Sequence, residues 1–147
     1  MYDAEPCSSV LEAAGWIDFY HEEEPRNQHR WVLVLKENGE KIGTCGFHCR
    51  SAERHEAEPG CDLWPTYRRQ GYTYEAVSRI LDFSAKEMEV KTVFSHISVD
   101  NTASVRTALK LGFVRSGEQY YEEFHGQKYL HDIYVKTLSE EVKKGHN

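Results

Sequence analysis

The chain has 147 residues, 29% of them charged, with a formal net charge of −6. This length suits a single domain over residues 1–147, able to bury about two thirds of its unfolded surface without staples. The acidic balance argues against direct nucleic-acid binding and favours a cationic partner. Because no run reaches the roughly 18 apolar residues that span a bilayer, and residues 1–10 are acidic and polar, we expect a cytoplasmic protein with no membrane partner.

The first part of the chain predicts a helix followed by a β-hairpin. Ser8 and Ser9 offer a helix cap, and the apolar residues that follow recur at helical spacing to about Tyr20. Residues 21–30 form a polar, proline-containing loop. Residues 31–36 and 41–48 then predict two strands around a turn at 37–40.

The second part predicts alternating strands and helices, then a final strand pair. After a charged stretch at 51–58, we expect strands at 60–64 and 92–99 and helices at 72–88 and from Asn101 or Thr102 to Leu111. Residues 116–124 and 128–138 predict the final pair. Since strands alternate with helices only in the middle, the fold class should be α+β, with a mixed, mostly antiparallel sheet flanked by helices.

Cysteines and most histidines are interpreted as structural or exposed. Cys7, Cys45, Cys49 and Cys61 lack Cys-x-x-Cys spacing and are expected to be free thiols. In a regular strand over 44–49, Cys45 and Cys49 would share one face and His48 would point away, so we expect no metal site. Solvent exposure is expected for the histidines in polar surroundings, which are His21, His29, His55, His125, His131 and His146.

A phosphate-binding turn is the strongest functional signal. Residues 68–76 follow Leu63-Trp64-Pro65 and lead into the apolar pattern of the 72–88 helix. A turn that ends a strand and opens a helix leaves amide hydrogens unpaired at the positive end of the helix dipole, where a diphosphate can bind. Gly71 would let the ligand approach the backbone closely.

This turn resembles motif A of the Gcn5-related N-acetyltransferase superfamily, whose pattern is Gln/Arg-x-x-Gly-x-Gly/Ala. Arg68 and Gly71 fit it, whereas Thr73 replaces the small third residue and adds bulk near the diphosphate. The run at 70–76 also resembles the Lys-Gly-Tyr-Ala-Thr-Glu-Ala run of the RimJ/RimL-type branch, the ribosomal-protein N-terminal acetyltransferases. Glu75 and Ala76 match it outright.

A second motif agrees at the expected distance. Asn101, Ser104, Lys110, Gly112 and Phe113 reproduce the Asn-x-x-Ser and Lys-x-Gly-Phe of the same branch. A single glycine-containing loop would also fit an ordinary turn, but two spaced motifs in order make that alternative weak. The resemblance extends over about residues 8–138.

The resemblance implies the acyl-CoA N-acyltransferase (GNAT) fold, in which the strands at 60–64 and 92–99 splay apart and acetyl-CoA, the cosubstrate, lies between them. Members of the superfamily normally begin with a further strand and helix, and the resemblance leads us to expect that this chain starts at the second helix instead. The hairpin beginning at Trp31 should then have an exposed edge, or a partner chain covers it, as in a homodimer.

The resemblance also implies roles for individual residues. The backbone amide of Leu63 would bind the thioester oxygen, Asn101 the pantetheine arm, and Ser104 would relay a proton to the sulfur. Helix capping is the alternative for Asn101 and Ser104. The full set of expected cofactor-binding residues is Leu63, Arg68, Arg69, Gln70, Gly71, Tyr72, Thr73, Asn101 and Ser104.

For the base, the resemblance points to Glu123, with Glu122 and Glu118 as rivals. Strand alternation puts Glu122 and Glu123 on opposite faces, so only one of them can point into the groove. A solvated acidic face is the alternative for each. Tyr120 and Tyr121 are candidate acids or plain strand aromatics.

The leading function is therefore an N-acetyltransferase that moves the acetyl group of acetyl-CoA to a primary amine by direct attack. The acceptor is a protein N-terminus or a small molecule such as a polyamine, an aminoglycoside or an amino acid derivative. The alternative is an acetyltransferase-like domain that binds CoA or a partner without catalysis.

Overall fold

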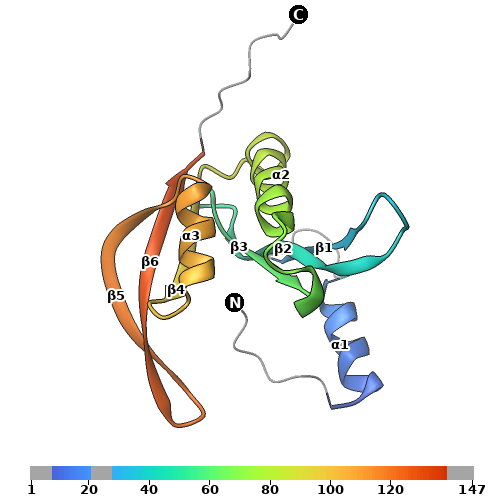
Figure 1. Cartoon of the computed structure of the whole chain (residues 1–147). Helices are drawn as coiled ribbons and strands as arrows, with labels where there is room; N and C mark the ends of the chain where they lie inside the picture. Colours follow the sequence, from blue (N-terminus) through green and yellow to red (C-terminus); the bar gives the residue numbers. More distant parts are fainter. Residues whose placement is uncertain (1–7, 21–27, 139–147) are drawn as a thin grey trace, which may run out of the picture.

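The structure, a computed structural model, describes residues 8–20 and 28–138 (Figure 1). Within these ranges, no helix is long and apolar enough to cross a membrane. The elements in chain order are α1 (Val10–Tyr20), β1 (His29–Val34), β2 (Lys41–Ser51), β3 (Glu56–Leu63), the short 3-10 helix η1 (Pro65–Tyr67), α2 (Tyr72–Glu87), β4 (Thr92–Ser98), α3 (Thr102–Lys110), β5 (Val114–Phe124) and β6 (Gln127–Thr137).

The strands form one mixed sheet in the order β1-β2-β3-β4-β6-β5. Strands β3 and β4 are parallel, and the other neighbouring strands described here are antiparallel. The α+β class and the mostly antiparallel sheet are thus confirmed. The expected order of helices and strands is confirmed as well, while the polar loop at 21–30 lies largely outside the described residues.

The sheet opens in its middle, between β3 and β4. These strands pair only at Glu56 with Thr92 and at Ala57 with Val93. Beyond these two pairs β3 continues to Leu63 and β4 to Ser98 without a shared register. The expected splay is therefore present, and it divides the sheet into a β1-β2-β3 half and a β4-β6-β5 half (Figure 1).

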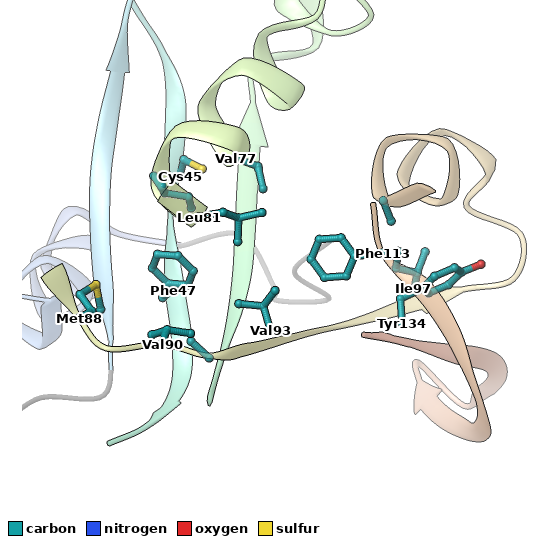
Figure 2. Close-up of a cluster of buried hydrophobic side chains, with 13 residues drawn as sticks. Cys45, Phe47, Val77, Leu81, Met88, Val90, Val93, Ile97, Phe113 and Tyr134 are labelled. Atoms are coloured by element: carbon teal, nitrogen blue, oxygen red, sulfur yellow. The ribbon is translucent and has the colours of Figure 1, made fainter. Parts of the chain in front are cut away.

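One hydrophobic core lies on the face of the sheet that carries α2 and α3. Figure 2 shows Phe47 and Leu81 near α2, Ile97 and Tyr134 on the other half, and Val93 between the two groups. Val77, Ile80 and Leu81 of α2 and Ala108 of α3 all bury their side chains in this cluster. Since Ala57 and Val93 also belong to it, the core holds the two halves together at the point where they still pair.

Local capping explains where the outer helices begin. At α1, the Ser9 hydroxyl accepts a hydrogen bond from the Glu12 amide, and the Glu12 carboxylate accepts one from the Ser8 amide. At α3, the Asn101 side chain accepts one from the Ser104 amide. Gly112 follows α3 with a φ of 89°, a left-handed conformation that suits glycine at a helix end.

Two strands are longer than expected at the turn between them. Strand β2 extends to Ser51 and β3 begins at Glu56, where the sequence predicts a charged loop. Cross-strand pairing outweighs the low β-propensity of these polar residues, because Glu58 lies opposite His48 and its carboxylate is 3.4 Å from His48 Nε2.

A β-bulge in β2 corrects one expectation. His48 pairs with Glu58 and Ser51 with Glu56, so that Cys49 and Arg50 together face the single residue Ala57. Cys49 adopts a φ of 52°. The assumption of a regular strand over 44–49 is therefore wrong at its end, and Cys49 does not share a face with Cys45.

Strand β1 is an edge of the sheet in the described chain, as expected for the hairpin beginning at Trp31. Val32 and Val34 are 56% and 51% exposed. Cys45, Cys49 and Cys61 are free thiols, as predicted, while Cys7 lies outside the described residues.

Candidate active site

The start of α2 leaves a row of backbone amides available. Gly71 is the N-cap residue with a φ of 85°, and Arg69 before it has a φ of 62°. The first amide that donates along the helix is that of Glu75, to the Gly71 carbonyl. In the described chain, the amides of residues 69–74 donate to no other part of the protein. The turn therefore has the unpaired donors and the helix dipole that an anion needs.

The side chains around this turn leave its outer surface open. Arg68, Arg69 and Gly71 are exposed, and a Cβ built on Gly71 would meet no atom within 4 Å. Gln70 donates back to the Thr66 carbonyl at 2.9 Å. The Thr73 hydroxyl lies 4.0 Å from the Cys61 sulfur on β3, so the extra bulk of Thr73 is directed at the sheet.

The backbone of β3 directs the Leu63 amide toward the splay. The Trp64 amide donates to the Ile42 carbonyl of β2 at 2.9 Å. Because successive amides of a strand point to opposite sides, the Leu63 amide points away from β2, toward β4. No residue of β4 pairs with Leu63, because β3 and β4 have already separated at this point. The donor expected for a thioester oxygen thus has the required direction.

Helix α3 places the second motif beside β4. Asn101 Oδ1 accepts the Ser104 amide at 3.2 Å, so the capping alternative for Asn101 is confirmed. The Asn101 Nδ2 and the Ser104 hydroxyl have no hydrogen-bond partner within residues 8–20 and 28–138. Both groups are half-buried, and both remain available to a ligand.

The remaining residues of the second motif stabilise the local structure. The Lys110 ammonium lies 4.2 Å from the centre of the Tyr74 ring, which links α3 to the first turn of α2. Phe113 is buried in the core. Lys136 donates to the Leu111 carbonyl at 2.7 Å, and a Cβ on Gly112 would lie 2.8 Å from its nitrogen. The left-handed backbone conformation therefore favours glycine at 112, while a larger residue would only require the end of the flexible Lys136 side chain to shift.

A polar cluster lies on the sheet face opposite α2 and α3. Cross-strand pairs share a face, and alternate residues along a strand do so too. Ala57 and Val93 face the core, so the residues next to them point to the opposite side. The registers place these polar residues on that side: His48, Glu58, His96, Tyr120, Glu122 and His131.

Glu58 bridges the two halves where they begin to separate. Its Oε1 accepts the His96 amide of β4 at 3.4 Å, and its Oε2 lies 3.4 Å from His48 Nε2. Burial acts to raise the pKa of the Glu58 carboxyl. The hydrogen bond and charge of His48, together with His96, outweigh burial and hold this pKa below its ordinary value. Glu58 is therefore an anion at neutral pH.

His96, Tyr120 and His131 form a connected group on the second half. The Tyr120 hydroxyl lies 2.9 Å from His96 Nδ1, and the Tyr120 ring stacks on His131 at 5.3 Å. His131 Nε2 is 3.3 Å from a Glu122 carboxylate oxygen. Sequence reasoning set His48 aside and did not single out Glu58 or His96. Strands β4 and β6 contain one histidine each, so only the register between the strands could show that His96 and His131 share a face.

The expected glutamates separate as strand alternation predicts. Glu122 points to the polar cluster, whereas Glu123 lies opposite Lys128 on the other face near the β5-β6 turn and is exposed. Glu118 is exposed as well. The assignment of Glu123 as base stays a prediction.

The prediction of exposed histidines is wrong for two of them. His29 and His131 are only 8% and 5% exposed. His131 is enclosed because Tyr120 covers its ring and the Tyr129 carbonyl and Glu122 satisfy its nitrogens. His125 is exposed as expected and His55 is partly buried, while His21 and His146 lie outside the described residues.

Comparison with known proteins identifies the class. Residues 2–114 match the acetyltransferase (GNAT) domain family. The chain is 29% identical over 135 residues to the uncharacterized N-acetyltransferase p20 of Bacillus licheniformis, covering 90% of this chain and 75% of that protein. It is 28% identical over 136 residues to the uncharacterized N-acetyltransferase YoaA of Bacillus subtilis, covering 90% and 76%.

Solved structures agree on the fold. The spermidine N-acetyltransferase of Vibrio cholerae, in complex with CoA and spermine, superposes with a TM-score of 0.80 at 20% identity over 92% of this chain and 79% of that chain. The chain belongs to the acetyltransferase (GNAT) domain family. It is an acetyl-CoA-dependent N-acetyltransferase.

Proposed function

We propose that the protein transfers the acetyl group of acetyl-CoA by direct attack to the primary amine of a cationic acceptor. One observation carries this proposal. The open amides of the α2 turn and the Leu63 amide both border the place where β3 and β4 separate. If the diphosphate of acetyl-CoA binds the amides of the α2 turn and its thioester binds the Leu63 amide, the acetyl group lies between the two halves of the sheet.

On the cosubstrate side, the proposed groups are mostly backbone. The amides of residues 69–74, with Arg68 and Arg69, hold the diphosphate. The Leu63 amide stabilises negative charge on the thioester oxygen, a contribution of about 3 kcal/mol if the geometry is preorganised. Asn101 Nδ2 donates to the pantetheine arm, and the Ser104 hydroxyl relays a proton from solvent to the departing thiolate, donating its own proton as it takes up another.

On the acceptor side, the proposed groups are side chains. The amine nitrogen forms a bond to the carbonyl carbon, the carbon-sulfur bond breaks, and the amine loses a proton. The anionic Glu58 attracts the cationic acceptor, and the hydrogen-bonded pair of His96 and Tyr120 lies on the same face to receive the proton. Glu123, and its rivals Glu122 and Glu118, remain alternatives for this last role.

The negative charge of the protein favours some classes of acceptor over others. The chain carries 24 acidic against 18 basic residues, and the polar cluster adds Glu58 and Glu122 on one face. This favours a small polycationic amine, and the fold shared with the spermidine enzyme of Vibrio cholerae supports the same choice. The RimJ/RimL-type motifs support a ribosomal-protein N-terminus as the second candidate. Free thiols fit a reducing cytoplasm, where we place the reaction.

A panel of acceptors tests the proposal. Purified protein is incubated with acetyl-CoA and either spermidine, spermine, an aminoglycoside or a peptide with a free N-terminus, and released CoA thiol is measured. Turnover with one class identifies the acceptor. Binding of CoA by calorimetry without turnover on any amine would contradict catalysis. No comparison favours the non-catalytic alternative.

The Ser104→Ala variant tests the proton donor. We expect kcat to fall by about 100-fold with little change in stability, because the hydroxyl has no partner in the described fold. The matched control is Thr107→Ala on the same helix, whose hydroxyl binds the Ala103 carbonyl and lies outside the proposed site. Equal kcat values for both variants would remove Ser104 from the mechanism.

A further inference from the structure

Three side chains with metal-binding atoms converge where β2 turns into β3. One ligand atom each of His48, Cys49 and Glu58 lies within 4.8 Å of the other two. His48 and Glu58 are partly buried, while Cys49 is exposed. We propose that these residues form a three-ligand zinc site; acetyl transfer does not need the metal, although it shares Glu58 with this site.

The bulge in β2 creates this convergence. In a regular strand, His48 and Cys49 would point to opposite faces. The extra residue of the bulge and the φ of 52° at Cys49 turn both side chains toward Glu58. A left-handed conformation at a residue other than glycine is strained, and such strain persists where the surrounding structure holds it in place.

The distances fit a tetrahedral ion. His48 Nε2 and Glu58 Oε2 are 3.4 Å apart. A tetrahedron with metal-ligand bonds of about 2.0 to 2.1 Å has edges of about 3.4 Å, so this pair already has the spacing that zinc requires. The Cys49 sulfur needs a shift of about 1 Å to complete the third position. Its exposure allows that movement.

The chemistry of the three ligands favours zinc over other divalent cations. A thiolate, an imidazole and a carboxylate match the borderline softness of Zn²⁺, whereas Mg²⁺ and Ca²⁺ prefer oxygen ligands alone. The second Glu58 oxygen accepts the His96 amide, which fixes the carboxylate as outer-shell contacts do in known sites. The fourth position is left to water or to a further ligand, as at an open site.

Cobalt binding tests the site without any activity measurement. The full chain is treated with a chelator, and Co²⁺ is added as a spectroscopic substitute for Zn²⁺. We expect the near-ultraviolet absorption of a sulfur-to-cobalt bond and the intense visible bands of tetrahedral cobalt. Zinc should displace them. Absence of these bands in the wild-type protein would overturn the proposal.

Variants assign the ligands. Cys49→Gly removes the sulfur and also relieves the strained φ, so the protein should fold with an unchanged or higher Tm while losing the sulfur-to-cobalt band. His48→Gln should weaken zinc binding by roughly 100-fold or more, since even outer-shell changes cost tenfold to 100-fold. The matched control is Cys61→Ser. Cys61 and Cys45 form the rival thiol pair, because they lie opposite each other on the other face.

A band that survives in Cys49→Gly and disappears in Cys61→Ser would overturn the assignment in favour of that pair. One further consequence rests on the proposed function. Zinc on Glu58 should inhibit acetyl transfer in the wild type but much less in Cys49→Gly. If the cobalt bands appear as expected and zinc does not inhibit, the metal site stands and the acceptor role of Glu58 is wrong.

Discussion

The two halves of the sheet differ in what they contribute. The β1-β2-β3 half, with α2, contains the deeply buried side chains of Cys45, Phe47 and Ser84, and in our proposal it binds the cosubstrate through backbone amides. The β4-β6-β5 half carries a strand, β5, whose residues are nearly all exposed, and it supplies His96, Tyr120 and His131. The first half thus recognises a constant ligand by backbone, whereas the second provides side chains that can vary with the acceptor.

The largest expected effect is on the free energy of unfolding, for one substitution in each half of the sheet. Phe47 is 1% exposed in the core of the first half, and Tyr121 on β5 is 68% exposed. Phe47→Ala should lower the free energy of unfolding by about 3 to 5 kcal/mol, because it leaves a cavity. Tyr121→Ala should change it by less than about 0.5 kcal/mol. Denaturation in urea measures both, and similar losses would contradict the difference in burial between these two positions.

The next effect concerns catalysis on the second half. Tyr120→Phe removes the hydroxyl that contacts His96 Nδ1 at 2.9 Å. We expect kcat to fall by about 100-fold, the lower range for a proton-transfer group, with little effect on CoA binding. The matched control is Tyr129→Phe, since the Tyr129 hydroxyl is also hydrogen-bonded to a side chain, that of Gln127 on the same hairpin. Equal turnover of the two variants would contradict a chemical role for Tyr120.

A smaller effect tests the backbone recognition of the first half. Gly71 and Gly126 have φ values of 85° and 75°, and an added Cβ would meet nothing within 4 Å at either one. Alanine therefore introduces a similar strain at both positions, about 1 to 2 kcal/mol. Only at Gly71 would the methyl group lie where the diphosphate approaches.

Calorimetry with CoA distinguishes the two variants. Gly71→Ala should bind CoA about tenfold more weakly, a difference of about 1.4 kcal/mol, while Gly126→Ala should bind it like the wild type. Equal affinities would show that CoA does not approach the backbone at the start of α2.

The same contrast explains how much the sequence could predict. The α2 turn was predictable because glycine, arginine and a following apolar stripe are local signals. The Asn101 cap was predictable for the same reason. The polar cluster was not, because Glu58, His96 and Tyr120 come together only through the register of separate strands.

Two local rules also failed for physical reasons. Strand alternation predicted that the side chains of His48 and Cys49 point to opposite faces. The bulge that changes this could not be predicted, because the residue with left-handed backbone is Cys49, where no glycine marks the position. Polarity predicted an exposed His131, but its ring is covered by Tyr120 and its nitrogens are satisfied. In both cases the deciding partner lies on another strand.

The smallest expected effect distinguishes the two roles of the Asn101 side chain, which are capping of α3 and binding of CoA. Asn101 Oδ1 caps α3, which leaves Nδ2 for the pantetheine arm. Asn101→Ala should cost about 1 kcal/mol of stability, while Asn101→Asp should retain it because a carboxylate also caps a helix. Both variants lose the Nδ2 donor, so both should bind CoA a few-fold more weakly. If Asn101→Asp keeps its stability and also binds CoA like the wild type, the side chain is only a helix cap, and recognition of CoA by the second half rests on Ser104 alone.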